Sequence, residues 1–343
     1  MRCIIQDFKV TPGKSCLYAS LYDLMAYYGY MLGESDIFYI CDGFHFEYES
    51  LESNLKFNAG ERLTSDNCEK WAREFSDVLS IEARIGKEIK DERVFQSLIG
   101  ALANNNPILL LVDSKVLDYH PRHYQLNNIQ DSHCIILYGV DDKENHAYIG
   151  DSYILDNTGE VILYSGEFPL NRVIESTRGF VWFNIDASKA VDKKKIFDKM
   201  AENLERFLTE KREGTLLKGN LALYRCIDDI RMMKEIDTRV FEAVCTEFAY
   251  FISAHFLSKF DYLINMLAED RSFHINHHEV ILEDVKSLKS DWSSFCVHLL
   301  RAGFSTNKSQ IDRIAENGIN LVRKQERIFF EVLNQIKAVV DTV

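Results

Sequence analysis

Proline is missing from the second half of the chain. The four prolines all lie within the first 169 of the 343 residues, at Pro12, Pro107, Pro121 and Pro169. Proline in a helix interior costs about 3 kcal/mol, so its absence from the remaining residues permits long helices. We therefore expect the second half to be helical and the first half to be divided by turns.

Long apolar runs and excess positive charge are missing as well. No window approaches the roughly 18 uninterrupted apolar residues that a membrane span requires, and the N-terminal MRCIIQDFKV lacks the apolar stretch of a signal peptide. The formal net charge of -13 argues against nucleic acid or an anionic membrane surface as partner. These absences predict a cytoplasmic protein that binds neither.

Paired cysteines are the third absence. The eight cysteines are spread over the chain, and none of them forms a C-x-x-C motif. This spacing is typical of reduced thiols and not of a disulfide framework. The length and the 46% hydrophobic content suit two domains, each with a sizeable core.

The first half of the chain mixes helical and strand periods. Apolar spacing predicts helices over residues 16–28, 66–75 and 91–102, followed by strands over 108–112, 133–140, 146–150, 161–164 and 179–185. The polar residues 142–145 predict a hairpin. Helices followed by a mostly antiparallel sheet indicate an α+β fold. From about Lys189 the period is helical throughout, so we place two domains at 1–187 and 188–343.

Cys16 is the first candidate for chemistry. Ser15 can cap the helix that follows, which places Cys16 in its first turn. The backbone N–H groups and the positive end of the helix dipole favour a thiolate there, and the same N–H groups can hold an oxyanion. Taken alone, a single cysteine is more often a small buried hydrophobic residue.

His133 and Asp151 strengthen that candidate. His133 opens a strongly apolar strand, and pairing around the hairpin turn places it roughly opposite Asp151. A carboxylate that orients an imidazole suits a base for a thiol nucleophile. The alternatives are an edge histidine with satisfied hydrogen bonds and a turn-forming aspartate. Together, however, Cys, His and Asp follow the chain order of papain-like cysteine enzymes.

Two blocks of sequence resemble a known family. The first covers residues 15–48 and carries a helix-opening Cys16, then Tyr28-Gly29, Leu32-Gly33-Glu34, and Gly43-Phe44 with a further aromatic residue. The second covers residues 112–120 and 131–152. Both are similar to the N-terminal domain of butirosin biosynthesis protein H. The layout also resembles that of double-glycine leader peptidases.

The resemblance implies a papain-like fold and a cysteine acyltransferase. Such enzymes take an acyl group from a carrier-protein thioester and pass it to an amine, which forms an amide in natural-product biosynthesis. By position, Cys16 would be the nucleophile, His133 the base and acid, and Asp151 the residue that orients His133. The substrate would arrive on the phosphopantetheine arm of the carrier protein, with no other cofactor and no metal.

The resemblance also implies substrate-binding roles for Ser15, Asp113 and Tyr119. A strand-end turn is the alternative role for the last two. Ser15 stands where the family usually has histidine, and Val10 stands where papain-like peptidases place the oxyanion-hole glutamine. We therefore expect the oxyanion hole to use the backbone N–H of Cys16 and a nearby side chain.

Several alternatives stay open from the sequence. The same triad would suit a cysteine peptidase or amidase, and a chain with an unreactive Cys16 would be a binding module. Two histidine clusters, at residues 120–123 and 274–278, match no zinc pattern and are interpreted as loops. Carrier proteins are acidic, as this chain is, so docking would need basic residues such as 193–195, 211–212 and 218, or mostly apolar contact. The helical half could dock a partner, cover the cleft or form a homodimer.

Overall fold

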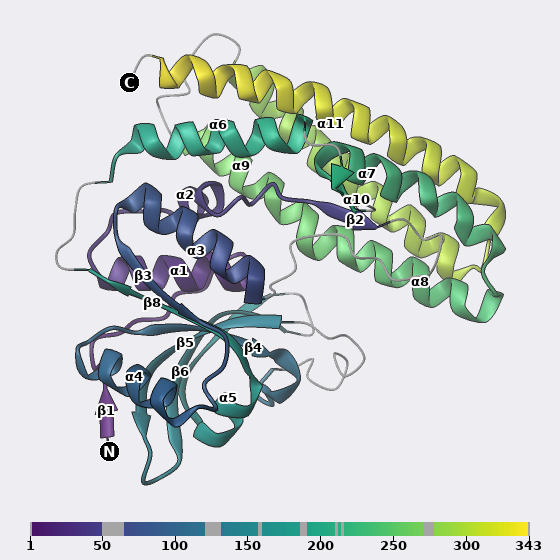
Figure 1. The fold of residues 1–343 in the computed structure, drawn as a ribbon. Helices are drawn as coiled ribbons and strands as arrows, with labels where there is room; N and C mark the ends of the chain where they lie inside the picture. The colour runs from purple at the N-terminus through teal and green to yellow at the C-terminus, as the bar shows by residue number, and fades with distance from the viewer. Residues whose placement is uncertain are drawn as a thin grey trace. The chain divides into compact units, whose positions relative to one another are not determined.

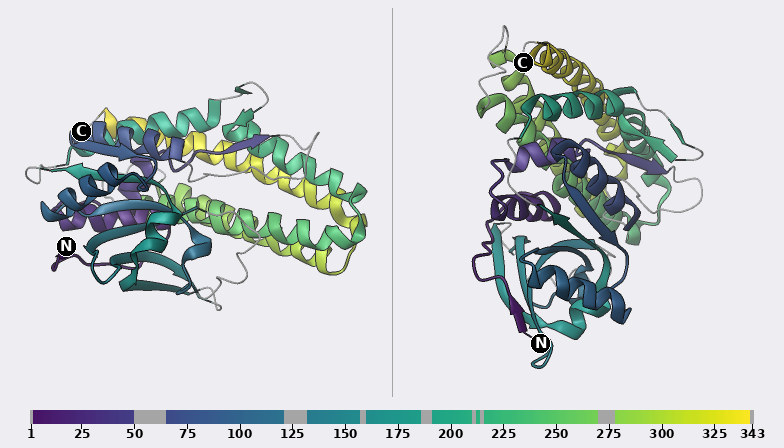
Figure 2. Two further views of the ribbon diagram at one scale, coloured as in Figure 1. Left: turned by 60° about the horizontal axis from the view of Figure 1, so that its bottom comes forward. Right: turned by 60° about the vertical axis from the view of Figure 1, so that its left-hand side comes forward.

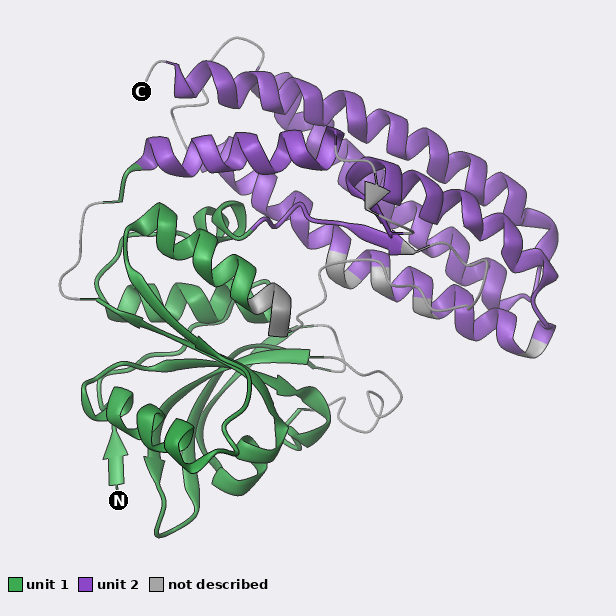
Figure 3. Ribbon diagram, in the orientation of Figure 1, with its two compact units in different colours: residues 1–41, 62–192 green, residues 42–61, 193–343 purple. Residues whose placement is uncertain are grey.

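The structure is a computed structural model. It describes residues 2–49, 65–120, 132–156, 160–185, 191–209, 212–213, 216–269 and 278–341. The chain divides into two compact units (Figures 1 and 3). Unit 1 comprises residues 1–41 and 62–192, and unit 2 comprises residues 42–61 and 193–343. Unit 1 joins helices to an antiparallel sheet and unit 2 is mainly helical, so the predicted α+β class is confirmed.

Unit 1 is built on a seven-stranded sheet with the strand order β3-β8-β4-β5-β6-β7, in which β1 also pairs with β5. The strands are β1 (Arg2–Ile4), β3 (Glu82–Gly86), β4 (Ile108–Asp113), β5 (Ser132–Asp141), β6 (His146–Leu155), β7 (Val161–Pro169) and β8 (Thr177–Asn184). The strands described in this sheet pair in antiparallel fashion. The central strands β4 and β5 are buried on both faces, which explains their continuous apolar sequences.

Helices lie on both faces of this sheet (Figure 2). They are α1 (Cys16–Tyr27), α2 (Glu34–Ile40), α3 (Ser65–Leu79), α4 (Glu92–Ala103) and α5 (Leu170–Ser176). Helix α1 packs against β5 and β6. It ends where predicted, because Gly29 adopts a positive φ of 79° and the Tyr30 N–H bonds back to the Met25 carbonyl. This is a Schellman cap, which glycine adopts without steric cost.

The β5–β6 hairpin forms as predicted, but its register differs. Asp141 pairs with His146 at the turn. An irregularity between Leu137 and Gly139 then shifts the pairing, and the last pair of the ladder is Ile136 with Gly150. Asp151 is therefore not directly opposite His133. It lies on the same face at the diagonal position, which is still within reach of a long side chain.

Unit 2 consists mainly of long helices. They are α6 (Lys193–Thr209), α7 (Gly219–Asp228), α8 (Thr238–Phe251), α9 (Leu257–Glu269), α10 (His278–Phe304) and α11 (Ile311–Val340), with a π-helical turn at Ile252–Phe256. The prediction of helix throughout is wrong at one place, where β2 (Glu47–Glu49), β9 (Arg212–Glu213) and β10 (Leu216–Lys218) form a small sheet. Among the described residues, no helix combines the length and apolar character needed to cross a bilayer.

Residues 42–49, which we call the strap, pack with unit 2 although they follow α2 in the chain. Phe44, Phe46 and Tyr48 alternate along it and are at most 1% exposed. The Phe44 ring contacts Phe329 at 5.5 Å, and the Tyr48 hydroxyl donates to Asp229. This alternation is why the observed units differ from a single division at residue 187. The Gly-Phe motif of the first family block therefore belongs to the packing of unit 2.

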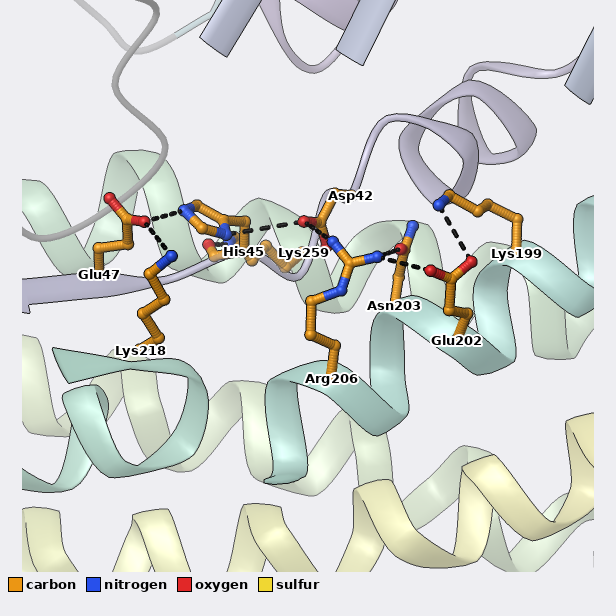
Figure 4. Close-up of polar contacts among 9 residues, drawn as sticks. All are labelled: Asp42, His45, Glu47, Lys199, Glu202, Asn203, Arg206, Lys218 and Lys259. Atoms are coloured by element: carbon orange, nitrogen blue, oxygen red, sulfur yellow. Dashed lines mark hydrogen bonds and ion pairs between the residues drawn. The ribbon is translucent and has the colours of Figure 1, made fainter. Parts of the chain in front are cut away.

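Polar contacts also hold the strap (Figure 4). Arg206 donates to Asp42 at 2.8 Å, and Lys259 donates to the His45 carbonyl at 2.6 Å. The His45 ring lies 3.0 Å from Glu47, which also lies 3.6 Å from Lys218. The aromatic and the polar contacts together fix the strap on the helices of unit 2.

Candidate active site

Cys16 is the first residue of α1, as the sequence predicts. The backbone of Ser15 is extended there, but its side chain makes no capping hydrogen bond. Glu34, the first residue of α2, accepts hydrogen bonds from the N–H groups of Lys14 at 2.9 Å and Ser15 at 3.1 Å. The glutamate of the Leu-Gly-Glu motif therefore fixes the turn that presents the cysteine.

Gly13 ties the same turn to the sheet. Its N–H donates to the Ser152 carbonyl at 2.9 Å, directly after Asp151 on β6. A Cβ at this position would lie 2.3 Å from the Ala19 Cβ, so only glycine fits without a shift. The turn before Cys16 and the strand end that carries Asp151 are therefore held together.

His133 and Asp151 form a buried hydrogen-bonded pair. The imidazole Nε2 lies 2.8 Å from Oδ2 of Asp151; His133 is 9% exposed and Asp151 is fully buried. The other carboxylate oxygen, Oδ1, accepts the Tyr153 N–H at 3.2 Å. Because Nε2 is engaged by Asp151, Nδ1 is the ring nitrogen left to face the Cys16 sulfur.

The sulfur and the imidazole act on each other electrostatically. The pKa of Cys16 is lowered well below its ordinary value, first by a hydrogen bond from the Cys134 side chain. Burial opposes this shift, and the charge and hydrogen bond of His133 add to it. Burial alone would lower the pKa of His133, but the charges of Asp151 and Cys16 raise it well above its usual range. The arrangement favours a thiolate–imidazolium pair.

The other cysteines do not share this environment. Burial raises the pKa of the Cys245 and Cys296 thiols to about 12 and that of Cys226 well above its ordinary value. Cys16 is partly exposed, whereas these three are buried. Of the cysteines described with a shifted pKa, Cys16 is the one whose thiolate is stabilised.

Asp23 is a residue of this region that the sequence reasoning missed. It lies on the buried face of α1 and accepts hydrogen bonds from the Ser152 hydroxyl at 2.5 Å and from the N–H and hydroxyl of Thr11. Burial raises its pKa, against the effect of these bonds. Asp23 therefore links α1 to β6 beside Asp151. The sequence carries one signal of this role, which is an aspartate between Leu21 and Leu24 on the apolar face of the helix.

The residues predicted to bind substrate occupy different environments. Asp113 ends β4, accepts the Lys115 N–H at 3.1 Å and lies 3.6 Å from Arg178, as a residue in a strand-end turn would. Tyr119 directs its hydroxyl to Asp151, and Ser15 is partly exposed beside Cys16. Their roles toward substrate stay predictions.

Neither of the two positions before Cys16 that could carry an oxyanion-hole glutamine supplies one among the described residues. Gln6 is exposed, and Val10 occupies the position of the expected glutamine. The Val10 side chain packs so closely on β6 that a Cβ on Gly150 would lie 2.5 Å from its Cγ2. The backbone N–H of Cys16, at the start of α1, is the donor that the turn offers.

The histidine clusters fall largely outside the described residues, namely Pro121–His123 and residues 274–277. His120 is described, and its ring lies 6.4 Å from the ring of His133 in an edge-on arrangement. Within the described part of the chain, no three His, Cys, Asp or Glu residues are grouped to hold a metal ion.

Comparison with known proteins agrees with the resemblance seen in the sequence. Residues 15–152 match the family described as Butirosin biosynthesis protein H, N-terminal. The matched segment lies within the first half of the chain. It includes Cys16, His133 and Asp151, and the family name links it to antibiotic biosynthesis. A search of curated proteins gave no match.

Proposed function

We propose that unit 1 is a cysteine acyltransferase that forms amides in natural-product biosynthesis. The donor would be an acyl thioester on the phosphopantetheine arm of a carrier protein, and the acceptor an amine. The observation that carries the proposal is that one imidazole, His133, is bonded to Asp151 and also stabilises the Cys16 thiolate. The family of residues 15–152 supports the assignment to biosynthesis.

In the first step, the Cys16 thiolate attacks the thioester carbonyl. The resulting tetrahedral oxyanion would be held by the backbone N–H of Cys16. Collapse of this intermediate breaks the bond to the phosphopantetheine sulfur, and the His133 imidazolium gives its proton to that leaving thiolate. The products are the free carrier thiol and an acyl group on Cys16. This acyl-enzyme is also a thioester, so its energy is close to that of the donor.

In the second step, the amine nitrogen attacks the acyl-enzyme. Neutral His133 removes the proton of the incoming amine, and the Cys16 thiolate leaves. Asp151 stabilises the imidazolium that forms again, through the contact of 2.8 Å. The products are the amide and the thiolate–imidazolium pair with which the cycle began. No other cofactor is required for either step.

Docking of the carrier protein would depend on local charge. The basic residues 193–195 are exposed at the start of α6. Lys218 lies close to Glu47, and Lys211 falls outside the described residues. We propose the lysines of α6 as contacts for an acidic carrier protein; Lys194 also donates to the Val340 carbonyl at 2.9 Å.

Intact-protein mass spectrometry tests the first step. We expect the protein to gain one acyl group from an acyl-loaded carrier protein and to lose it when an amine is added. Cys16→Ala should gain none. The matched control is Cys3→Ala, since Cys3 is also partly exposed but has a pKa raised by burial; it should be acylated like the wild type. Acylation that persists in Cys16→Ala would contradict the proposal.

The molecule that accepts the acyl group distinguishes the proposed acyltransferase from a peptidase or amidase. A cysteine peptidase or amidase would use the same acyl-enzyme, so the geometry of the site supports both. Cleavage of a peptide without any amine would favour the peptidase. A Cys16 that resists both acylation and iodoacetamide would indicate a binding module instead.

A further inference from the structure

Tyr119 makes a direct contact with the proposed triad. Its hydroxyl donates to Oδ2 of Asp151 at 3.0 Å, and this is the same oxygen that lies 2.8 Å from His133 Nε2. The carboxylate of Asp151 is fully buried, where an oxygen without a donor is costly. With the Tyr153 N–H on Oδ1, Asp151 has three donors: the ring of His133, one hydroxyl and one backbone N–H.

The Tyr119 ring is itself held firmly. It stacks on Tyr164 of β7, with ring centroids 4.1 Å apart and planes 6° apart, and meets the edge of Phe168 at 5.6 Å. The turn before it is held by Arg172 of α5, which donates to the Val116 carbonyl and to Asp118. The position of the Tyr119 hydroxyl is therefore fixed by residues from two other elements of unit 1.

We propose that Tyr119 is a positioning residue that orients Asp151 toward His133. The inference rests on the proposed function, because it assigns Tyr119 a role in the same triad. The hydroxyl limits rotation of the carboxylate and shares its negative charge, so that His133 is held with Nδ1 toward Cys16. This differs from a substrate-binding role, because the hydroxyl is already engaged by Asp151.

The chemistry of the phenol agrees with a constant donor. Burial, followed by the charge and hydrogen bond of Asp151, raises the pKa of Tyr119 well above its ordinary value. The hydroxyl therefore keeps its proton throughout the pH range in which His133 works. When the hydroxyl is removed, the negative charge on Oδ2 is less dispersed, so it should hold the imidazolium proton more tightly, and the carboxylate is freer to rotate.

The test compares Tyr119→Phe with Tyr148→Phe in single-turnover acylation by an acyl-loaded carrier protein. Tyr148 lies on the same strand as Asp151, but its hydroxyl donates to Glu167 at 3.1 Å on an exposed surface. Tyr119→Phe should lower the rate about 10-fold or more, from the loss of a hydrogen bond to a charged group. The alkaline limb of its pH profile, which reports His133, should move to higher pH. Tyr148→Phe should match the wild type in both.

The outcomes are separable from those of the proposed function. A wild-type Cys16 that is not acylated, and not alkylated by iodoacetamide, would refute the function itself. If the wild type is active and Tyr119→Phe has the same rate and pH profile, only the role of Tyr119 is refuted. A slower Tyr119→Phe variant with an unchanged pH profile would refute that role as well. If Tyr119→Phe fails to fold, Tyr164→Leu removes the stacking partner and keeps the hydroxyl; an unchanged rate there would also refute the role.

Discussion

Asp151→Asn gives the sharpest test of the electrostatics of the site. The substitution keeps the shape of the side chain and removes its charge. The amide can also donate to Nε2 of His133, which would place the remaining ring proton on Nδ1, toward the sulfur. A neutral imidazole in that tautomer cannot accept a proton from the thiol at Nδ1. We expect a folded protein in which the thiolate–imidazolium pair is disfavoured.

The size of the effect follows from the lost contact. The contact of 2.8 Å between His133 and Asp151 is a buried, charge-assisted hydrogen bond, and such bonds contribute about 1.5–3 kcal/mol. Since 1.36 kcal/mol corresponds to a tenfold change, the ion pair should become about 10- to 160-fold less populated relative to the neutral pair. At neutral pH, alkylation of Cys16 by iodoacetamide should slow by a factor that approaches this range.

The contribution of His133 to the free energy of unfolding depends on pH with a definite sign. The pKa of His133 is raised in the folded protein, so the stabilisation by its charge is fully present below the ordinary histidine pKa. It is lost as the pH rises through the raised pKa. In Asp151→Asn that loss should begin at lower pH, so the difference in unfolding free energy between wild type and variant should shrink at high pH. Urea denaturation at several pH values measures the free energies of unfolding of the two proteins. Reaction with iodoacetamide at the same pH values measures the alkylation rates of Cys16. Equal alkylation profiles for the two proteins would refute this account of the site.

Three further predictions concern residues around the site and the strap. Cys134→Ala should slow alkylation of Cys16 about 2- to 10-fold at low pH, because a hydrogen bond to the sulfur is lost; Cys245→Ala in unit 2 is the control. Glu34→Ala should lower the free energy of unfolding by about 1.5–3 kcal/mol, since the N–H groups of Lys14 and Ser15 lose a charged acceptor. Phe44→Ala should lower it by about 3–5 kcal/mol, whereas the exposed Met31→Ala should change it by less than about 0.5 kcal/mol. A denaturation midpoint of Phe44→Ala equal to that of Met31→Ala would contradict the role of the strap.

The sequence predicted the elements whose own pattern is strong. Helix α1 begins at Cys16 and ends before Gly29, where an N-terminal turn and a glycine supply both signals. Strands β4 and β5 are apolar over their whole length and were also predicted. The shorter elements were missed, among them β1 and α2, since three to seven residues carry too little periodicity to stand out from a loop.

The failures share a physical cause, which is contact between distant parts of the chain. The strap alternates aromatic and polar residues, but only its packing on helices far along the chain assigns it to unit 2. The β-irregularity at Leu137–Gly139 shifts the hairpin register without a clear signal in the sequence. The predicted pair of His133 and Asp151 nevertheless meets, because residues on the same face reach a diagonal neighbour as well as an opposite one.

Groups outside the helix also act on the Cys16 thiol. Glu34 brings a negative carboxylate to the N–H groups directly before the helix, which offsets the positive end of the dipole. The groups that lower the pKa of the thiol are Cys134 and His133, neighbours on β5. The helix start therefore positions the thiol, and β5 adds a hydrogen bond from Cys134 and the charge of His133. It follows that Cys134→Ala should affect the thiolate more than the stability of the fold, and that Glu34→Ala should do the reverse.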